Sequence, residues 1–143
     1  MKLQSAPIIA GTAEGEALVS NEPLSFWGGY DQHTGEIIDR RHPLSGVIAA
    51  GKVLALPFSR GSSAATAVLL ESIRAGTAPA AILTSGTDSY FALAAIVADE
   101  MYDKTIPILA LSAETFAQIQ TGQWIQVQPD GTLTISPPSS GRR

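Results

Sequence analysis

The sequence of 143 residues contains no cysteine and only two histidines. The absence of cysteine excludes disulfide bonds, thiolate metal sites and cysteine nucleophiles. Because histidines are so few, we also expect no metal site built by this chain alone. Thiol chemistry and metal chemistry are therefore not functions that we expect the chain to perform unaided.

Charged residues are also few, at 15% of the sequence, and the formal net charge is −4. No basic stripe or aromatic platform indicates a nucleic-acid partner. No apolar run reaches the length needed to span a membrane, and the first four residues lack the apolar core of a signal peptide. We therefore expect a cytoplasmic protein that binds neither nucleic acid nor membrane.

What the sequence does contain is an alternation of apolar strands with helical segments through its middle. The predicted strands are 53–56, 80–84 and 106–111, the predicted helices between and after them are 64–74, 90–103 and 114–120, and a hairpin over 124–135 closes the series. Such alternation predicts a parallel sheet with crossover helices. Ahead of it, we expect a strand or hairpin over 8–20 and a short strand over 36–39.

The predicted fold class is therefore α/β, a β/β/α domain with a mainly parallel central sheet, helices and a C-terminal β-hairpin. Since 45% of the residues are hydrophobic, the chain can build an ordinary globular core. We expect one domain over residues 1–135 and a disordered tail over 136–143, which is rich in proline, serine and glycine.

The loop between strand 53–56 and the following helix holds the most suggestive residues. The start of a helix presents free backbone N–H groups and positive potential. Arg60, Gly61, Ser62 and Ser63 bring a guanidinium, a flexible glycine and two hydroxyls to that point. This pattern predicts a site for an anion such as a carboxylate or a phosphate. The same residues also fit a plain helix N-cap with Arg60 in solvent, so both interpretations stay open.

A second candidate active-site loop contains Gly28, Gly29, Asp31 and His42. Asp31 and His42 are suitable for acid/base work or for positioning a substrate. The two glycines allow a sharp turn or a close approach to another surface. The alternative is structural, with the glycines making turns and His42 serving as a loop residue. Neither loop contains a complete catalytic set.

Four motifs follow one another along the chain, at residues 25–31, 34–39, 42–46 and 57–63. Together they resemble the small subunit of the aconitase X family, and the resemblance extends from about residue 11 to residue 135. It implies the swivelling β/β/α fold that forms the mobile domain of aconitase-like hydro-lyases.

The resemblance also implies a function. In that superfamily a Gly-Ser-Ser loop supplies the serine base of a dehydration, which makes Ser62 the catalytic candidate. Arg60, Gly61 and Ser63 then become substrate-binding candidates. The iron–sulfur cluster or iron is expected in a large subunit, with none bound by this chain alone. The expected activity is that of a hydro-lyase that works only with its large subunit.

The expected substrate is a small hydroxy acid, cis-3-hydroxy-L-proline, with phosphomevalonate as the alternative. A hypothesis of another class is a non-catalytic anion-binding or regulatory domain. For the contact with a large subunit, we expect an exposed aromatic rim formed by Phe26, Trp27 and Tyr30, because aromatic side chains suit a partner surface.

Overall fold

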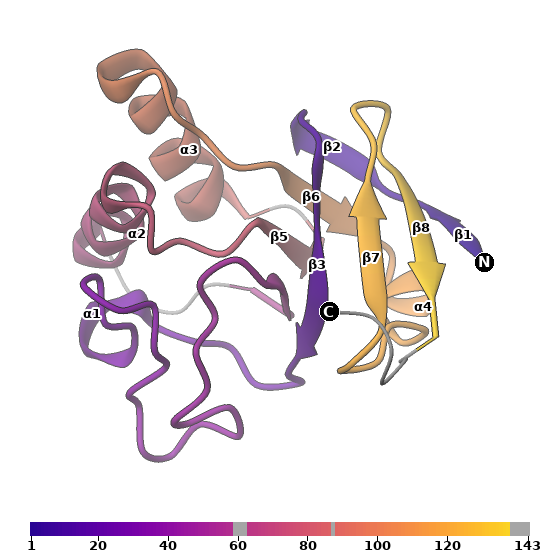
Figure 1. Ribbon diagram of the computed structural model, residues 1–143, viewed down its shortest axis with the longest axis horizontal. Helices are drawn as coiled ribbons and strands as arrows, with labels where there is room; N and C mark the ends of the chain where they lie inside the picture. Colours follow the sequence, from indigo (N-terminus) through magenta and orange to yellow (C-terminus); the bar gives the residue numbers. More distant parts are fainter. Residues whose placement is uncertain (59–62, 87, 138–143) are drawn as a thin grey trace.

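A mixed sheet and helices on one side of it form the part of the chain that the computed structural model describes, residues 1–58, 63–86 and 88–137. The strands are β1 (Lys2–Gln4), β2 (Ala6–Ile9), β3 (Ala13–Val19), β4 (Val53–Leu56), β5 (Ala81–Ser85), β6 (Ile108–Leu111), β7 (Trp124–Val127) and β8 (Thr132–Ser136). The helices are α1 (Phe26–Gly29), α2 (Ser63–Ala75), α3 (Ser89–Tyr102) and α4 (Ala113–Phe116). The strand order is β1-β8-β7-β3-β4-β5-β6-β2 (Figure 1).

The centre of the sheet consists of the four parallel strands β3, β4, β5 and β6. Their register pairs Ala17 with Val53, Val53 with Ala81, and Ile82 with Ile108. Helix α2 follows β4 and α3 follows β5, so the crossovers are helical and match the predicted ranges to within one residue. The predicted α/β class and the mainly parallel centre of the sheet are confirmed.

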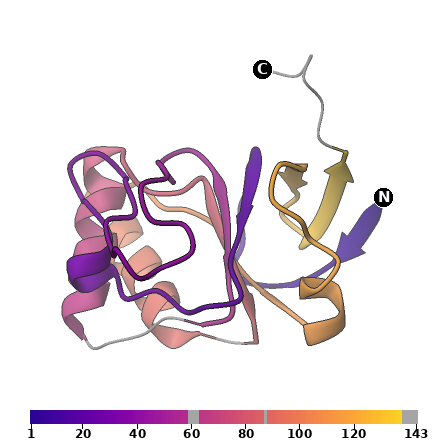
Figure 2. The same cartoon turned by 90° about the horizontal axis from the view of Figure 1, so that it is seen from below.

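Three layers follow from this topology. Strands β7, β8 and β1 continue the sheet from β3 in antiparallel fashion and fold over one face of the parallel strands (Figure 2). Helices α2 and α3 cover the other face. One hydrophobic core lies between the helices and the sheet, and a second core lies between the two β layers. This is the predicted β/β/α arrangement, with the predicted C-terminal hairpin formed by β7 and β8.

The first nine residues form two short strands at opposite ends of the strand order. Strand β1 pairs with β8 and strand β2 pairs with β6, and only Ser5 separates the two strands. Ser5 is buried, and its backbone N–H and its hydroxyl both donate to the carbonyl oxygen of Gly131, at 3.0 and 2.6 Å. The sequence predicts a strand only from residue 8 onward. It misses β1 because that strand is three residues long with no buried side chain.

Two predicted elements are corrected by the structure. The expected strand over 36–39 is reduced to isolated bridges, which pair Tyr30 with Ile37 and Glu36 with Ile48. The chain turns back there because Gly35 and Gly46 both have positive φ. The expected helix over 114–120 is the single turn α4.

The expected domain boundary can be compared with the last strand. Strand β8 runs to Ser136, one residue past the expected boundary at 135, and residues 138–143 of the expected tail lie outside the described residues. Across the described ranges, no helix has the length and apolarity required to cross a membrane.

Gly35 provides a test of the packing of the loop between α1 and β4. Its φ is +81°, and a Cβ added there would lie 2.5 Å from the Ala50 Cβ atom and 2.7 Å from the Thr77 carbonyl oxygen. Gly35→Ala should lower the free energy of unfolding by about 2–4 kcal/mol, since left-handed strain and overpacking act together. Gly46→Ala is the matched control, because Gly46 has φ +87° but open space around it. Urea unfolding that gave equal losses for both variants would contradict the proposed close packing.

Candidate functional site

The carboxyl ends of the parallel strands define the edge of the sheet where a site is expected. Ser20 follows β3, and its backbone N–H donates to the Ala55 carbonyl oxygen of β4 at 3.0 Å. Pro57 accepts from Ser85, and Leu111 accepts from Gly86, so the ends of β4, β5 and β6 lie together. The connection from β4 to α2 leaves from this edge.

The strongest sequence candidates belong to that connection. Arg60, Gly61 and Ser62 lie outside the described residues. Ser63 is the first residue of α2, and only its backbone is described. The structure therefore fixes where the loop leaves the sheet and where it enters the helix.

Two helices of more than ten residues begin at this edge, and they differ at their N-termini. In α3 the Oδ1 atom of Asp88 accepts from the backbone N–H groups of Tyr90 and Phe91, both at 3.1 Å. A carboxylate thus already meets the positive end of α3. The first turn of α2 carries no acidic residue. Of the two helix starts, that of α2 is therefore the better suited to an external anion.

Thr66 in the first turns of α2 was not singled out from the sequence. Its hydroxyl oxygen is buried and has no hydrogen-bond partner within the described residues. Buried polar groups are nearly always paired, so an unpaired hydroxyl beside a candidate site is notable. A threonine next to two serines gives no sequence signal for such a role, because hydroxyl residues are common at helix starts.

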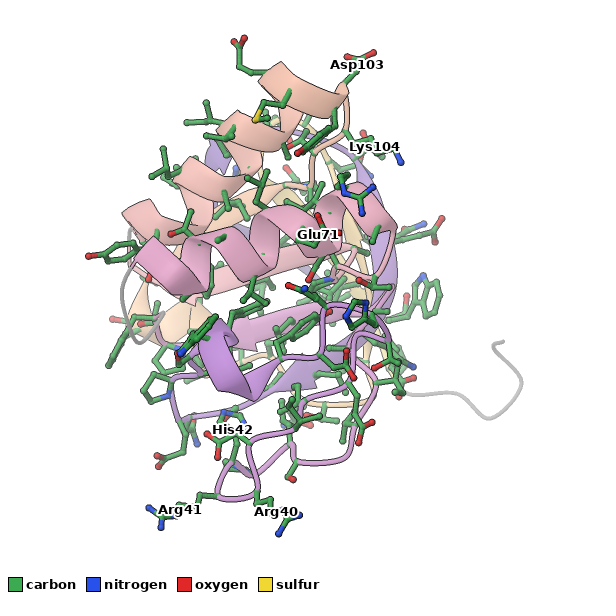
Figure 3. All side chains as sticks on the ribbon, turned by 90° about the vertical axis from the view of Figure 1, so that its left-hand side faces the viewer. Arg40, Arg41, His42, Glu71, Asp103 and Lys104 are labelled. Carbon is green, nitrogen blue, oxygen red and sulfur yellow. The ribbon has the colours of Figure 1, made fainter. Side chains whose placement is uncertain are left out.

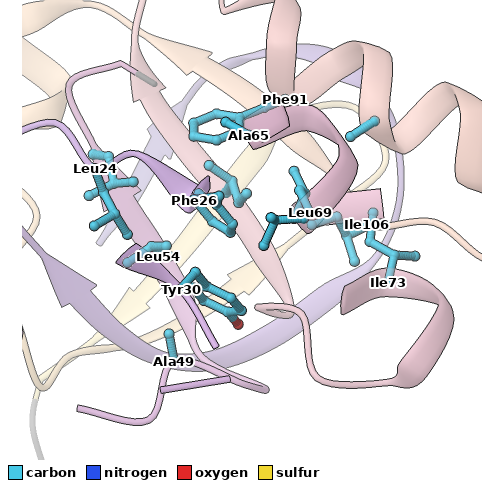
Figure 4. Packing of buried hydrophobic residues seen from close by; sticks show 14 of the residues in the cluster. Leu24, Phe26, Tyr30, Ala49, Leu54, Ala65, Leu69, Ile73, Phe91 and Ile106 are labelled. Carbon is cyan, nitrogen blue, oxygen red and sulfur yellow. The ribbon is translucent and has the colours of Figure 1, made fainter. Parts of the chain in front are cut away.

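Three aromatic rings, two from residues 26–30 and one from α3, pack together in the core between the helices and the sheet (Figure 4). Phe26 stacks on Tyr30 with ring centroids 4.5 Å apart, and it meets the edge of Phe91 at 5.4 Å. The Tyr30 hydroxyl donates to the Thr77 carbonyl oxygen at 2.6 Å, and burial raises the pKa of Tyr30. The cluster holds residues 26–30 against α2.

The expected aromatic rim is therefore wrong for two of its three members. Phe26 and Tyr30 are 0% and 3% exposed, whereas Trp27 is 68% exposed. The kinked turn closes with the Tyr30 backbone N–H donating to the Phe26 carbonyl oxygen at 3.3 Å, and the two rings stack on each other in the core. Trp27 has an extended ψ of 113° and does not join them.

Asp31 lies far from the start of α2. Thr77, just past the C-terminal end of α2, accepts from Tyr30 and donates its hydroxyl to the Gln32 carbonyl oxygen at 2.6 Å. The 13 residues of α2 make it about 20 Å long, at 1.5 Å per residue. The backbone N–H of His33 donates to Asp31 Oδ1 at 2.8 Å and holds the pKa of that carboxyl below its usual range. Asp31 is thus placed in a turn and is not brought to the candidate site.

The two candidate glycines belong to the kinked turn α1. Gly28 has φ +77°, which lies in the left-handed region, and it has open space around it. Gly29 is buried, and a Cβ at that position would lie 3.1 Å from Leu24 Cδ1. Both glycines therefore have turn and packing reasons for their identity.

His42 is buried inside the loop, while Arg40 and Arg41 extend outward from it (Figure 3). The backbone N–H of Leu44 donates to His42 Nδ1 at 3.1 Å, so the proton is assigned to Nε2. That Nε2 lies 3.2 Å from the Glu22 carbonyl oxygen and 3.4 Å from the Ser20 hydroxyl. This geometry ties the loop to the end of β3 and leaves neither ring nitrogen free for a substrate. His42 is thus suited to positioning.

The described residues do not fit a metal or an iron–sulfur cluster. The sequence has no cysteine, and no group of three or more histidine, aspartate or glutamate side chains gathers within the described part of the chain. Cluster chemistry requires thiolates or imidazoles at close range. Residues that could hold such a group are therefore not found in these ranges.

The role of His42 can be tested on the isolated chain. His42→Ala leaves the buried Leu44 N–H without its acceptor, so the free energy of unfolding should fall by about 1–3 kcal/mol. The other histidine, His33, is exposed, and His33→Ala should change stability by no more than about 0.5 kcal/mol. Chemical unfolding of the two variants measures the difference. Equal stability of both would show that the His42 contacts do not hold the loop.

Comparison with known proteins gives a family for this fold. The sequence matches the family of the aconitase X swivel domain over residues 2–135. It is 45% identical over 128 residues to the cis-3-hydroxy-L-proline dehydratase of Pseudomonas aeruginosa, covering 90% of this chain but 22% of that protein. The dehydratase of the same name from Hypocrea jecorina is 35% identical, again with 21% of its length covered. The chain therefore spans about a fifth of these two relatives.

Other relatives match over nearly their full length. The phosphomevalonate dehydratase small subunit of Thermococcus onnurineus is 36% identical, with 93% of this chain and 96% of that protein covered. The crystal structure of Thermococcus kodakaraensis aconitase X in its holo-form superimposes with a TM-score of 0.83 at 33% identity, covering 94% of this chain and 98% of that one. Sequence and fold agree, and the chain belongs to the aconitase X swivel domain family.

Proposed function

We propose that this chain is the swivelling small subunit of an aconitase X-type dehydratase whose active site is completed by a large iron–sulfur subunit. The observation that carries the proposal is the motif Gly61-Ser62-Ser63, which leads into α2 in a chain of this family. Helix α2 starts at the edge of the sheet where ligands of such folds bind, and its first turn has no acidic residue. The functional domain in this proposal is residues 1–135, in a cytoplasmic setting.

The proposed substrate is cis-3-hydroxy-L-proline. The support is the 45% identity to the Pseudomonas aeruginosa dehydratase of that substrate. The second candidate is phosphomevalonate, because small subunits of phosphomevalonate dehydratases match along 96% of their own length at 36% and 31% identity. Both substrates are small hydroxy acids with an anionic group. Assay of the assembled enzyme with each substrate distinguishes the two.

In the proposed mechanism, Ser62 Oγ takes the weakly acidic proton from the carbon next to the one that loses its hydroxyl. A serine oxygen is a weak base in water, so it needs nearby positive charge to act as an alkoxide. The N-terminus of α2 and the guanidinium of Arg60 are proposed to supply that charge and to bind the substrate anion with Gly61 and Ser63. The Thr66 hydroxyl, which has no partner within the described part of the chain, is a further candidate to bind a substrate oxygen.

The iron or iron–sulfur cluster is proposed to belong to the large subunit. The donor set of the present chain supports this proposal, because the chain has no cysteine and its described ranges hold no acidic or histidine cluster. The hypothesis of a non-catalytic anion-binding domain differs from this in one respect. It requires anion binding by the isolated chain and no dehydratase activity with any large subunit.

Ser62→Ala tests the proposed base in the assembled enzyme. The variant should lower kcat by about 10²–10⁴-fold, the usual effect of losing a general base, while KM changes little. If Ser62 only capped α2, its replacement by alanine would lower the free energy of unfolding by about 1 kcal/mol and leave turnover normal at low temperature.

Ser63→Ala is the paired control, because it removes the neighbouring hydroxyl from the same loop. Normal activity in Ser62→Ala with none in Ser63→Ala would move the base by one residue. Substantial activity in both variants would reject a serine base.

Iron analysis tests the proposed division between subunits. After separation from its partner, the small subunit should contain less than about one-tenth of an iron atom per chain, because it lacks the ligands of known cluster sites. The large subunit should carry the iron of the complex. Stoichiometric iron in the purified small subunit would contradict this division.

A further inference from the structure

Helix α3 is apolar on all sides through most of its length. Its inner face, formed by Phe91 and three alanines, is buried in the core between the helices and the sheet. The outer face of α3 consists of the exposed side chains of Tyr90, Leu93, Ile96 and Met101 together with the half-buried Val97. A helix that is hydrophobic all round is normally covered all round. Within the described residues, nothing covers this outer face.

The five residues of the outer face form two continuous rows. Residues three or four apart are neighbours on a helix surface. Tyr90, Leu93 and Ile96 follow one another at intervals of three, and Leu93, Val97 and Met101 at intervals of four. Leu93 and Ile96, at the centre, are 50% and 49% exposed. The face is therefore one contiguous apolar surface.

The exposed side of helix α2 differs from that of α3 because it carries charged residues. Glu71 and Arg74 form an ion pair on its exposed side. Such charged pairs are absent from the first ten residues of α3, where the charged residues begin at Asp99. Four of the nine exposed large hydrophobic side chains of the described residues lie on α3 alone. The concentration on one helix is what distinguishes this surface from scattered exposed residues.

We infer that the outer face of α3 is the surface on which the large subunit of the dehydratase docks. This inference rests on the proposed function and adds to it the location of the contact. In the two relatives of which this chain spans 22% and 21%, the matched region shares one polypeptide with about four-fifths of additional sequence, which supplies a partner of the size that such a face needs. An uncovered apolar helix is the kind of surface that packing against such a partner requires.

The position of the outer face favours the large subunit over a second copy of this chain. Tyr90, at one end of the face, lies two residues after the N-cap Asp88 at the carboxyl edge of the sheet. Its neighbour Phe91 meets Phe26 there. The apolar face therefore begins at the edge where a partner has to complete the active site. One partner can cover both, whereas a copy paired through α3 would cover only the helix.

The charge at the other end of the face indicates the chemistry of the partner surface. Asp99, Glu100 and Asp103 are exposed in and just after the last turns of α3. Figure 3 shows Asp103 at the far end of that helix, with Lys104 beside it. The Lys104 ammonium donates to the Arg74 carbonyl oxygen at 3.2 Å. The matching partner surface is an apolar patch with a basic rim at one end.

The test uses a double variant, Leu93→Lys with Ile96→Lys, in the full chain. Lysine is about as good a helix former as leucine, and both positions are half exposed, so the fold should be kept. The matched control is Ile38→Lys with Ile48→Lys. These two isoleucines are exposed to a similar extent, at 42% and 45%, and belong to the loop that carries Arg40 and Arg41 at the opposite end of the molecule (Figure 3).

Each chain is titrated with the purified large aconitase X subunit of the same organism, and the dissociation constant is measured by sedimentation. Unchanged circular dichroism and melting temperature confirm that each variant is folded. We expect the α3 double variant to bind at least about tenfold more weakly than wild type, as for loss of interface anchors, and the control to bind normally.

The outcomes separate the two proposals. Equal binding of wild type and the α3 double variant would overturn the docking surface and leave the proposed function intact. Failure of the wild-type chain to bind the large subunit would overturn the proposed function and the occupant named here. A wild-type dimer in isolation that the α3 substitutions dissociate would assign the surface to a second copy and overturn the inference.

Discussion

The structure depends on the fact that the middle strands of the sheet are buried on both faces. Every residue of β4 and β6, and all of β5 up to Thr84, is buried. Parallel strands of this kind require a cover on each side. Burying one leucine or isoleucine side chain contributes about 1.5–3 kcal/mol, so the stability of the domain comes largely from these two covers.

One of the two covers is helical and the other consists mainly of β-strands. Helices α2 and α3 come from the crossover connections themselves, and they could be predicted because strand and helix alternate so clearly. The other cover, β7 and β8 with α4, was predicted in outline from the hairpin turn at residues 130–131. The short strands β1 and β2 could not be fully predicted, because the pairing of Ser5 with Gly131 joins residues 126 positions apart.

For the candidate site, the sequence predicts local features well and distant contacts poorly. The loop into α2 was identified from a strand, a polar turn and a helix start that are adjacent in sequence. The separation of Asp31 from that loop depends on the bonds of Tyr30 and Gln32 to Thr77, about 45 residues away. The burial of Phe26 likewise depends on Phe91, which is 65 residues away in the sequence. No local pattern encodes such contacts.

The contrast between the N-termini of α2 and α3 shows how one edge of a sheet can serve two purposes. The carboxylate of Asp88 accepts hydrogen bonds from the first free N–H groups of α3, so the N-terminus of this helix is capped from within the chain. The start of α2 has no acidic residue in its first turn, and the buried Thr66 hydroxyl nearby has no partner among the described residues. The groups that pair with the N-terminus of α2 are therefore left to the preceding loop or to a molecule bound there.

The arrangement of β1 and β2 has a consequence for the protein during its synthesis. Exposed strand edges are templates for aggregation, and long flat edges are the most dangerous. Here the two edge strands have only three and four residues, and Ser5 joins them into one segment that is anchored to Gly131. The sheet therefore offers little to a neighbouring unfolded chain. The larger risk of self-association comes instead from the exposed apolar face of α3, which the short edge strands do not cover.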